Sequence, residues 1–195
     1  MSLLTRYWWV AVLAVVVLSI IGGMNTIPTL DEQVKASWAE VQNQYQRRSD
    51  LIPNLVETVK GVANFEKSTL TQVIEARADA TKVTISADTL NDPEAFKKFE
   101  AAQSQLSSAL SHLMAVSEQY PQLKADQNFL TLQSQLEGTE NRIAVARRDY
   151  IVNVQAYNIK VRTFPGVIWA HIYGVGPKPE FSATEGAEKP PTVSF

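Results

Sequence analysis

The scarcity of helix breakers over a long stretch most constrains how this chain can fold. Between residues 28 and 165, the only internal prolines and glycines are Pro53, Pro93, Pro121, Gly61 and Gly138. Apolar side chains recur through this stretch at steps of three and four, which is the spacing of one helix face, and alternating strand patterns are rare. The sequence therefore predicts a chain built from helices.

Four helices are expected, and short connections separate them. A second helix is expected after Asn64, a third at the Asp92–Pro93 pair, which suits an N-cap and a first helical position, and a fourth and longest after Pro121. The first helix begins near Thr29, which is its expected cap. Its inward stripe follows alternating steps of four and three: Val34, Trp38, Val41, Tyr45, Arg48, Ile52, Leu55, Val59 and Val62.

The predicted architecture is all-α. Amphipathic helices joined by short connections pack as an antiparallel up-and-down bundle, because each must bury its apolar stripe. We expect a four-helix bundle with long helices over residues 28–164. Residues 165–195 contain several prolines and are predicted to form an extended C-terminal segment.

An uncharged apolar run lies close to the N-terminus, after a flank of residues 1–7. Residues 8–25 carry no charged side chain and match the hydrocarbon thickness of a bilayer, about 30 Å, at the rise of a helix. We expect a single transmembrane helix here, with an aromatic belt at its start and small residues that permit close helix approach near its end. The residues that mark this anchor are Tyr7, Trp8, Trp9, Gly22 and Gly23.

A removable signal peptide is the alternative for this run. The basic residue Arg6 fits both readings, but the exit of the run lacks a small-x-small cleavage pattern, which favours a retained anchor. Because Arg6 precedes the span, the bundle is slightly favoured on the outer side of the membrane.

Composition and motifs exclude several classes of function. A net charge of −2 argues against a nucleic-acid-binding protein, and the absence of cysteine excludes disulfides, zinc knuckles and cysteine nucleophiles. His112 and His171 belong to no metal-ligand spacing, and the chain has neither a nucleophile elbow nor a glycine-rich phosphate loop. We therefore expect no catalytic, cofactor or metal site, and no nucleic-acid partner.

Charged residues of the first and fourth helices form a candidate cluster. Arg48 falls in the inward stripe, where an unpaired charge would be costly. Antiparallel packing places it near residue 146, beside Asp149. Pro53 removes one amide, so we expect a kink there, with Ser49 or Asn54 satisfying the freed backbone group. The cluster comprises Arg47, Arg48, Asp50, Pro53, Asn54, Arg147, Arg148 and Asp149. It is either a structural ion-pair group that fixes register or a docking surface for a partner.

Several segments together resemble the LemA family of bacterial membrane proteins. They are the run from Leu30 to Trp38, the proline-centred run 46–61, Glu75 to Arg77, residues 146–150, Tyr157–Asn158 followed by Phe164–Pro165, and the ending from Pro177. The resemblance covers nearly the whole chain, and a MamQ-like branch of the family belongs to magnetosome membranes. It implies one N-terminal span, an antiparallel four-helix bundle and no established enzymatic activity. It also implies a link to membrane stress and to a membrane zinc metalloprotease of the HtpX kind.

Two functions are consistent with these features. The first is a non-enzymatic scaffold, anchored by one span in the bacterial inner membrane, which assembles on or organises that membrane. The second is an adaptor that presents substrates or stress signals to a membrane protease through its C-terminal segment. The expected partners are the lipid bilayer and further copies of the chain, because the aromatic side chains exceed what one core needs: Trp38, Tyr45, Phe65, Tyr150 and Tyr157.

Overall fold

A computed structural model describes residues 8–10, 12–14, 23–86 and 89–181 of the chain. Among the described residues there are helices and loops but no strand, so the predicted all-α class is confirmed. The main elements are α2 (Thr26–Lys60), α3 (Lys67–Lys82), α4 (Pro93–Ser117) and α6 (Gln127–Arg162). Three short elements complete the fold: η1 (Thr89–Asn91), α5 (Pro121–Ala125) and α7 (Gly166–Tyr173).

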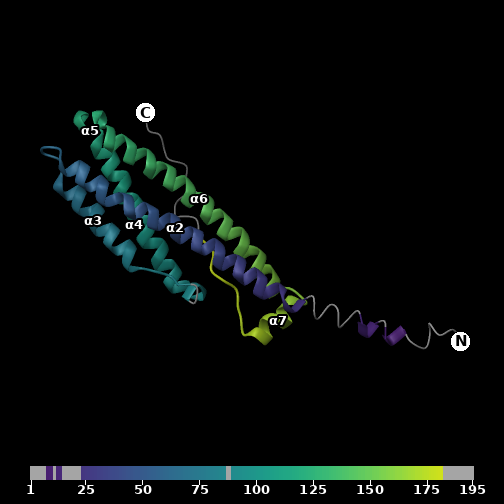
Figure 1. Ribbon diagram of the computed structural model, residues 1–195. Coiled ribbons are helices and arrows are strands. Elements are labelled where there is room, and N and C mark those ends of the chain that lie inside the picture. Colours follow the sequence, from purple (N-terminus) through teal and green to yellow (C-terminus); the bar gives the residue numbers. More distant parts are fainter. Residues whose placement is uncertain (1–7, 11, 15–22, 87–88, 182–195) are drawn as a thin grey trace, which may run out of the picture.

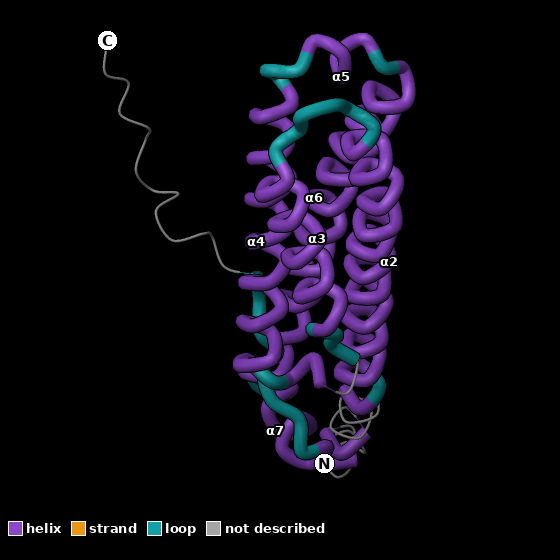
Figure 2. Tube along the Cα trace, turned by 90° about the vertical axis from the view of Figure 1, so that its left-hand side faces the viewer, coloured by secondary structure: helices purple, strands orange, loops and turns teal. Residues whose placement is uncertain are grey.

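The four long helices form an elongated bundle with α5 at one end and α7 at the other (Figures 1 and 2). Within it, α2 packs most closely against α6, and α3 packs most closely against α4. Two apolar cores result. One surrounds Trp38 and Tyr150 in the half of the bundle next to α7, and the other surrounds Leu55 and Leu113 in the half next to α5.

Local capping explains where these helices begin. The Asp92 carboxylate accepts hydrogen bonds from the amides of Glu94 (2.9 Å) and Ala95 (3.3 Å), as predicted. Asp126 caps α6 in the same manner, so the fourth long helix begins at Gln127 and Pro121 starts only the short α5. The Asn64 cap is wrong, because this residue has φ 67° in the turn before α3. The predicted cap at Thr29 is also wrong, since α2 already begins at Thr26.

The segment predicted to be extended from residue 165 contains a helix. Residues 166–173 form α7, because an apolar octapeptide without proline can bury Gly166 and Ala170 against the bundle. Gly174, at φ 64°, then ends α7 in the left-handed conformation that glycine adopts without strain. Beyond it, residues 175–181 are extended and run back along the bundle, in yellow in Figure 1. We call residues 174–181 the strap.

The structure does not describe the whole of the expected transmembrane helix, and it does not support the expected surplus of aromatic side chains. Residues 11 and 15–22 of the predicted span lie outside the described residues, as does Tyr7. Within the described part of the chain, no helix is both long and apolar enough to cross a membrane. The aromatic argument for a subunit boundary is wrong, because all five rings are buried inside one chain: Trp38, Tyr45, Phe65, Tyr150 and Tyr157.

Candidate functional site

A polar layer crosses the middle of the bundle and separates its two apolar cores. Arg48 and Ser49 contribute from α2, Gln103 from α4 and Thr139 from α6, and all four are buried. The apolar cores end on either side of this layer: on α2 one core reaches Tyr45 and the other starts at Ile52. Buried polar residues accept few alternative pairings, so a layer of this kind fixes the register of the helices around it.

Arg48 holds this layer together through a charged hydrogen-bond network. Its side chain is 1% exposed, and one guanidinium nitrogen donates to Glu140 Oε1 (2.8 Å) and to Ser107 Oγ (2.7 Å). The other donates to the side-chain oxygen of Gln103 (2.5 Å) and, at 3.3 Å, to its carbonyl. Arg48 also lies over the Tyr45 ring, 5.0 Å from its centroid. The side chain therefore joins α2, α4 and α6.

The predicted pairing of Arg48 with Asp149 is wrong. In the observed register Arg48 meets Glu140 and Trp38 meets Tyr150. The prediction assumed that α6 ends opposite residue 30, but α2 starts earlier and α7 occupies the end of the bundle. Asp149 instead faces solvent and lies 3.5 Å from Arg148 of the same helix.

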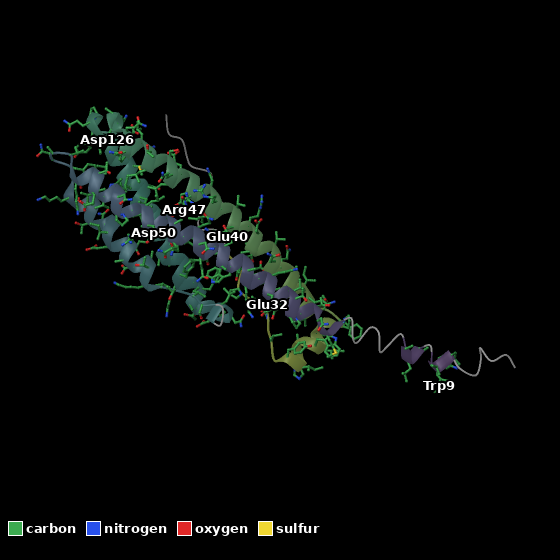
Figure 3. The ribbon with its side chains drawn as sticks, in the orientation of Figure 1. Trp9, Glu32, Glu40, Arg47, Asp50 and Asp126 are labelled. Carbon is green, nitrogen blue, oxygen red and sulfur yellow. The ribbon has the colours of Figure 1, made fainter. Side chains whose placement is uncertain are left out.

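The predicted cluster does not assemble into a single site. Arg147 turns inward, within 3.7 Å of Glu100 and with its guanidinium 4.3 Å from the centroid of the Phe181 ring. Arg47 and Asp50 lie on the exposed side of α2, part-way along it in Figure 3, and Asp50 accepts a hydrogen bond from Gln46. The other members face solvent as well: Pro53, Asn54, Arg148 and Asp149.

Arg77 is a structural residue that sequence reasoning missed. Helix α2 continues through Pro53, whose ring nitrogen cannot donate to the carbonyl of Ser49. The Nε of Arg77, on α3, donates to this carbonyl at 2.9 Å. The expectation that Ser49 or Asn54 satisfies the group is therefore wrong. Arg77 lies on another helix, so nothing in the sequence around Pro53 indicated its role.

The strap is held by a buried lysine. Lys178 is 5% exposed, and its ammonium contacts Asp31 Oδ1 and Asn91 Oδ1, both at 2.8 Å. Its backbone amide donates to Asn158 Oδ1, and Asn158 in turn donates to the Lys178 carbonyl. Burial raises the pKa of Asp31, but hydrogen bonds from Lys178 and Lys35 outweigh burial, so the pKa of this carboxyl is lowered.

An aromatic anchor continues the strap. The Phe181 ring packs within 4.9 Å of Phe96, 5.5 Å of Tyr150 and 6.2 Å of Trp38, measured between ring centroids. The Tyr150 hydroxyl donates to the carbonyl of Pro179 at 3.0 Å, and burial raises the pKa of this phenol. Lys178 and Phe181 therefore tie the strap to the folded core.

Two residues at the end of the predicted span, Gly23 and Met24, contact α7. Gly23 lies beneath the Trp169 indole, so closely that a Cβ on this glycine would lie 2.7 Å from Nε1. The Tyr173 hydroxyl donates to the Met24 carbonyl at 3.0 Å. Trp8 and Trp9 are exposed, and Gly22 lies outside the described residues.

Histidines and acidic side chains could serve a metal or catalytic site within the described ranges. No group of three His, Asp or Glu side chains in them is placed to hold a metal ion. His112 is exposed and lies 3.3 Å from the side-chain oxygen of Gln72. The buried arginine of the polar layer is surrounded by an amide, one hydroxyl and one carboxylate, and it already binds all three. The arrangement positions helices and offers no activated nucleophile.

Comparison with known proteins identifies relatives of this chain. It is 27% identical over 166 residues to Magnetosome protein MamQ 2 of Paramagnetospirillum magneticum strain AMB-1, an alignment that covers 77% of this chain and 61% of that protein. It is 25% identical over 185 residues to Magnetosome protein MamQ of Magnetospirillum gryphiswaldense (83% and 68% covered). It is 24% identical over 144 residues to Protein LemA of Metamycoplasma hominis (74% and 62%). The chain thus spans less than two thirds of the first of these relatives. A family model described as the LemA family matches residues 37–195, and the chain belongs to this family.

Proposed function

We propose that this protein is a non-enzymatic, membrane-anchored scaffold whose copies assemble side by side on the bacterial inner membrane. In this proposal residues 8–25 span the bilayer once and the bundle stands on the periplasmic side. The uncharged run and its aromatic start support the anchor. Relatives named as magnetosome proteins support a membrane setting.

An exposed row of aliphatic side chains on α6 carries the assembly part of the proposal. Val145, Val152 and Ile159 are 48%, 57% and 56% exposed and recur at intervals of seven residues. This interval places them along one face of the helix, as in the seam of a coiled coil. We call these three residues the α6 seam.

A second copy of the chain is the occupant that best suits this seam. Arg148 and Asp149 stand between Val145 and Val152, so the surface offers both signs of charge beside its apolar row. The seam of a second copy supplies the same apolar row, an aspartate to face each arginine and an arginine to face each aspartate. Exposed ion pairs contribute little energy, so the charges guide orientation while aliphatic burial stabilises the contact.

The size of the full chain in detergent tests this proposal. Mass photometry over a wide concentration range should show an oligomer for the unmodified protein. Val152→Glu should reduce it to monomers, because the charge enters the seam. Ile74→Glu is the matched control, since Ile74 is 45% exposed on α3 and away from the seam.

Two results would count against the scaffold. A strictly monomeric unmodified protein would favour the adaptor instead. An oligomer that Val152→Glu leaves intact would place the contact elsewhere. The adaptor has less support, because the segment expected to contact a protease lies on its own bundle as far as Phe181.

A further inference from the structure

Helix α7 exposes an apolar face that no other described element covers. Val167, Ile168 and Ile172 are 43%, 48% and 62% exposed, and Phe164, in the turn before the helix, is 80% exposed. The opposite face, with Gly166 and Ala170, is buried against the bundle. A short helix that buries its small residues and presents its large aliphatic ones is the reverse of an ordinary surface helix.

This face lies where the predicted membrane span meets the bundle. Gly23 packs under Trp169, and Met24 accepts a hydrogen bond from Tyr173. Residues 23 and 24 are the last part of the apolar run, so α7 sits directly beside its exit. Figure 1 shows α7 next to the start of α2, at this end of the bundle. Any bilayer that holds residues 8–25 therefore comes close to α7.

The charges around α7 suit an anionic lipid surface. From residue 150 to residue 179 the sequence contains no aspartate or glutamate. Arg162 is exposed in this stretch, and Lys160 is half-buried. The acidic residues at the start of α2 are already paired, Asp31 with Lys35 and Lys178, and Glu32 with Lys35. Apolar side chains edged by cations are typical of helices that lie in the headgroup layer.

The fold also holds α7 firmly in place. Gly166 approaches the Lys160 carbonyl so closely that a Cβ on it would lie 2.0 Å from that oxygen. At the other end of α7, the Val175 amide donates to the Ala170 carbonyl at 3.0 Å, and the strap fixes the residues that follow. A helix held at both ends presents its apolar face in one orientation.

We infer that α7 is an interfacial membrane helix, which inserts Phe164, Ile168 and Ile172 into the boundary between headgroups and acyl chains beside the transmembrane anchor. This inference rests on the proposed anchor and adds a second, independent contact with the same leaflet. Two such contacts fix the tilt of the bundle above the bilayer, which a single point of attachment cannot do.

The absence of cysteine makes site-directed spin labelling direct. Ile172→Cys and, as control, Ile74→Cys are each labelled in the full chain and reconstituted into vesicles of phosphatidylethanolamine and phosphatidylglycerol. Oxygen concentrates among acyl chains and a nickel chelate stays in water. The ratio of oxygen to nickel accessibility should be several-fold higher for the label at residue 172 than at residue 74. Unchanged circular dichroism verifies that both variants fold.

Three other results would each overturn the inference, and they can be told apart. Equal ratios at the two positions, in protein that floats with the vesicles, leave the anchor standing and refute the interfacial helix. Spin–spin broadening at residue 172, with both reagents excluded, shows that a second copy covers α7 instead of lipid. Protein that does not float with the vesicles refutes the anchor, and the interfacial helix with it.

Discussion

The Nε of Arg77 lies 2.9 Å from the backbone oxygen of Ser49, the carbonyl that Pro53 leaves without its helical amide partner. A side chain of α3 thus supplies the hydrogen-bond donor that the backbone of α2 lacks at this carbonyl. Because a buried or half-buried carbonyl without a donor is costly, Arg77→Ala should lower the free energy of unfolding by about 1–3 kcal/mol. Lys82→Ala, an exposed change on the same helix, should have little effect.

A second substitution separates this hydrogen bond from the general packing of Arg77. Pro53→Ala returns an amide to the Ser49 carbonyl, so Arg77→Ala should cost less in that background than in the unmodified protein. Urea unfolding of the unmodified protein, the two single variants and the double variant measures the difference. An Arg77→Ala cost that Pro53→Ala leaves unchanged would mean that the carbonyl does not account for it.

Double-mutant cycles can identify the acidic residue that pairs with Arg48. Arg48→Met should cost about 1–3 kcal/mol, because the buried side-chain oxygen of Gln103 loses its donor. In double-mutant cycles, Arg48→Met should couple to Glu140→Gln by at least about 0.5 kcal/mol and should add independently to Asp149→Asn. Coupling to residue 149 in place of 140 would support the register that the sequence alone led us to expect.

The strap should open in acid. The folded-state pKa of Asp31 lies below its unfolded value of about 3.9, so the contribution of this carboxylate is fully present above that value. It is lost as the pH falls through the folded pKa and Asp31 gains a proton. The protection factors of the amides of residues 174–181, which are their exchange rates relative to the intrinsic rates at the same pH, should therefore fall below about pH 4. Asp31→Asn should remove this part of the pH dependence, and strap exchange that is equally acid-sensitive in Asp31→Asn would contradict the assignment.

Two glycines of the C-terminal region should respond differently to a methyl group. In Gly166→Ala the Cβ meets the Lys160 backbone, which cannot yield as a side chain can, and we expect a loss of about 1–3 kcal/mol or more. Gly176→Ala should be nearly neutral, because no atom lies within 4 Å of the added carbon. Thermal unfolding compares the two. Equal effects would mean that α7 does not pack on the end of α6 as described.

Some features that depend only on nearby residues were predictable from sequence, although the caps at Thr29 and Asn64 were not. Asp92 caps α4 because its carboxylate needs only the two amides that follow it. The inward position of Arg48 followed from its place in the stripe of α2, and the side chain is indeed buried.

Features that depend on how distant elements meet were not predictable. Glu140 faces Arg48 because α2 already begins at Thr26 and α7 occupies the end of the bundle, which shifts α6 from the register expected from sequence. Lys178 sits in a proline-rich segment where nothing local distinguishes it from a solvated lysine, yet it is buried on Asp31 and Asn91. The close approach of Gly23 to Trp169 joins opposite ends of the chain, so no local sequence pattern predicts it.

Carbonate extraction of membranes from cells that express the full chain tests most directly whether residues 8–25 hold this bundle in a bilayer. The unmodified protein should stay in the pellet and still begin near Met1. A variant with Leu13→Arg and Val17→Arg should be released, because charges at the centre of a span oppose insertion. Release of the unmodified protein by carbonate, or a mature N-terminus beyond Asn25, would contradict the anchor.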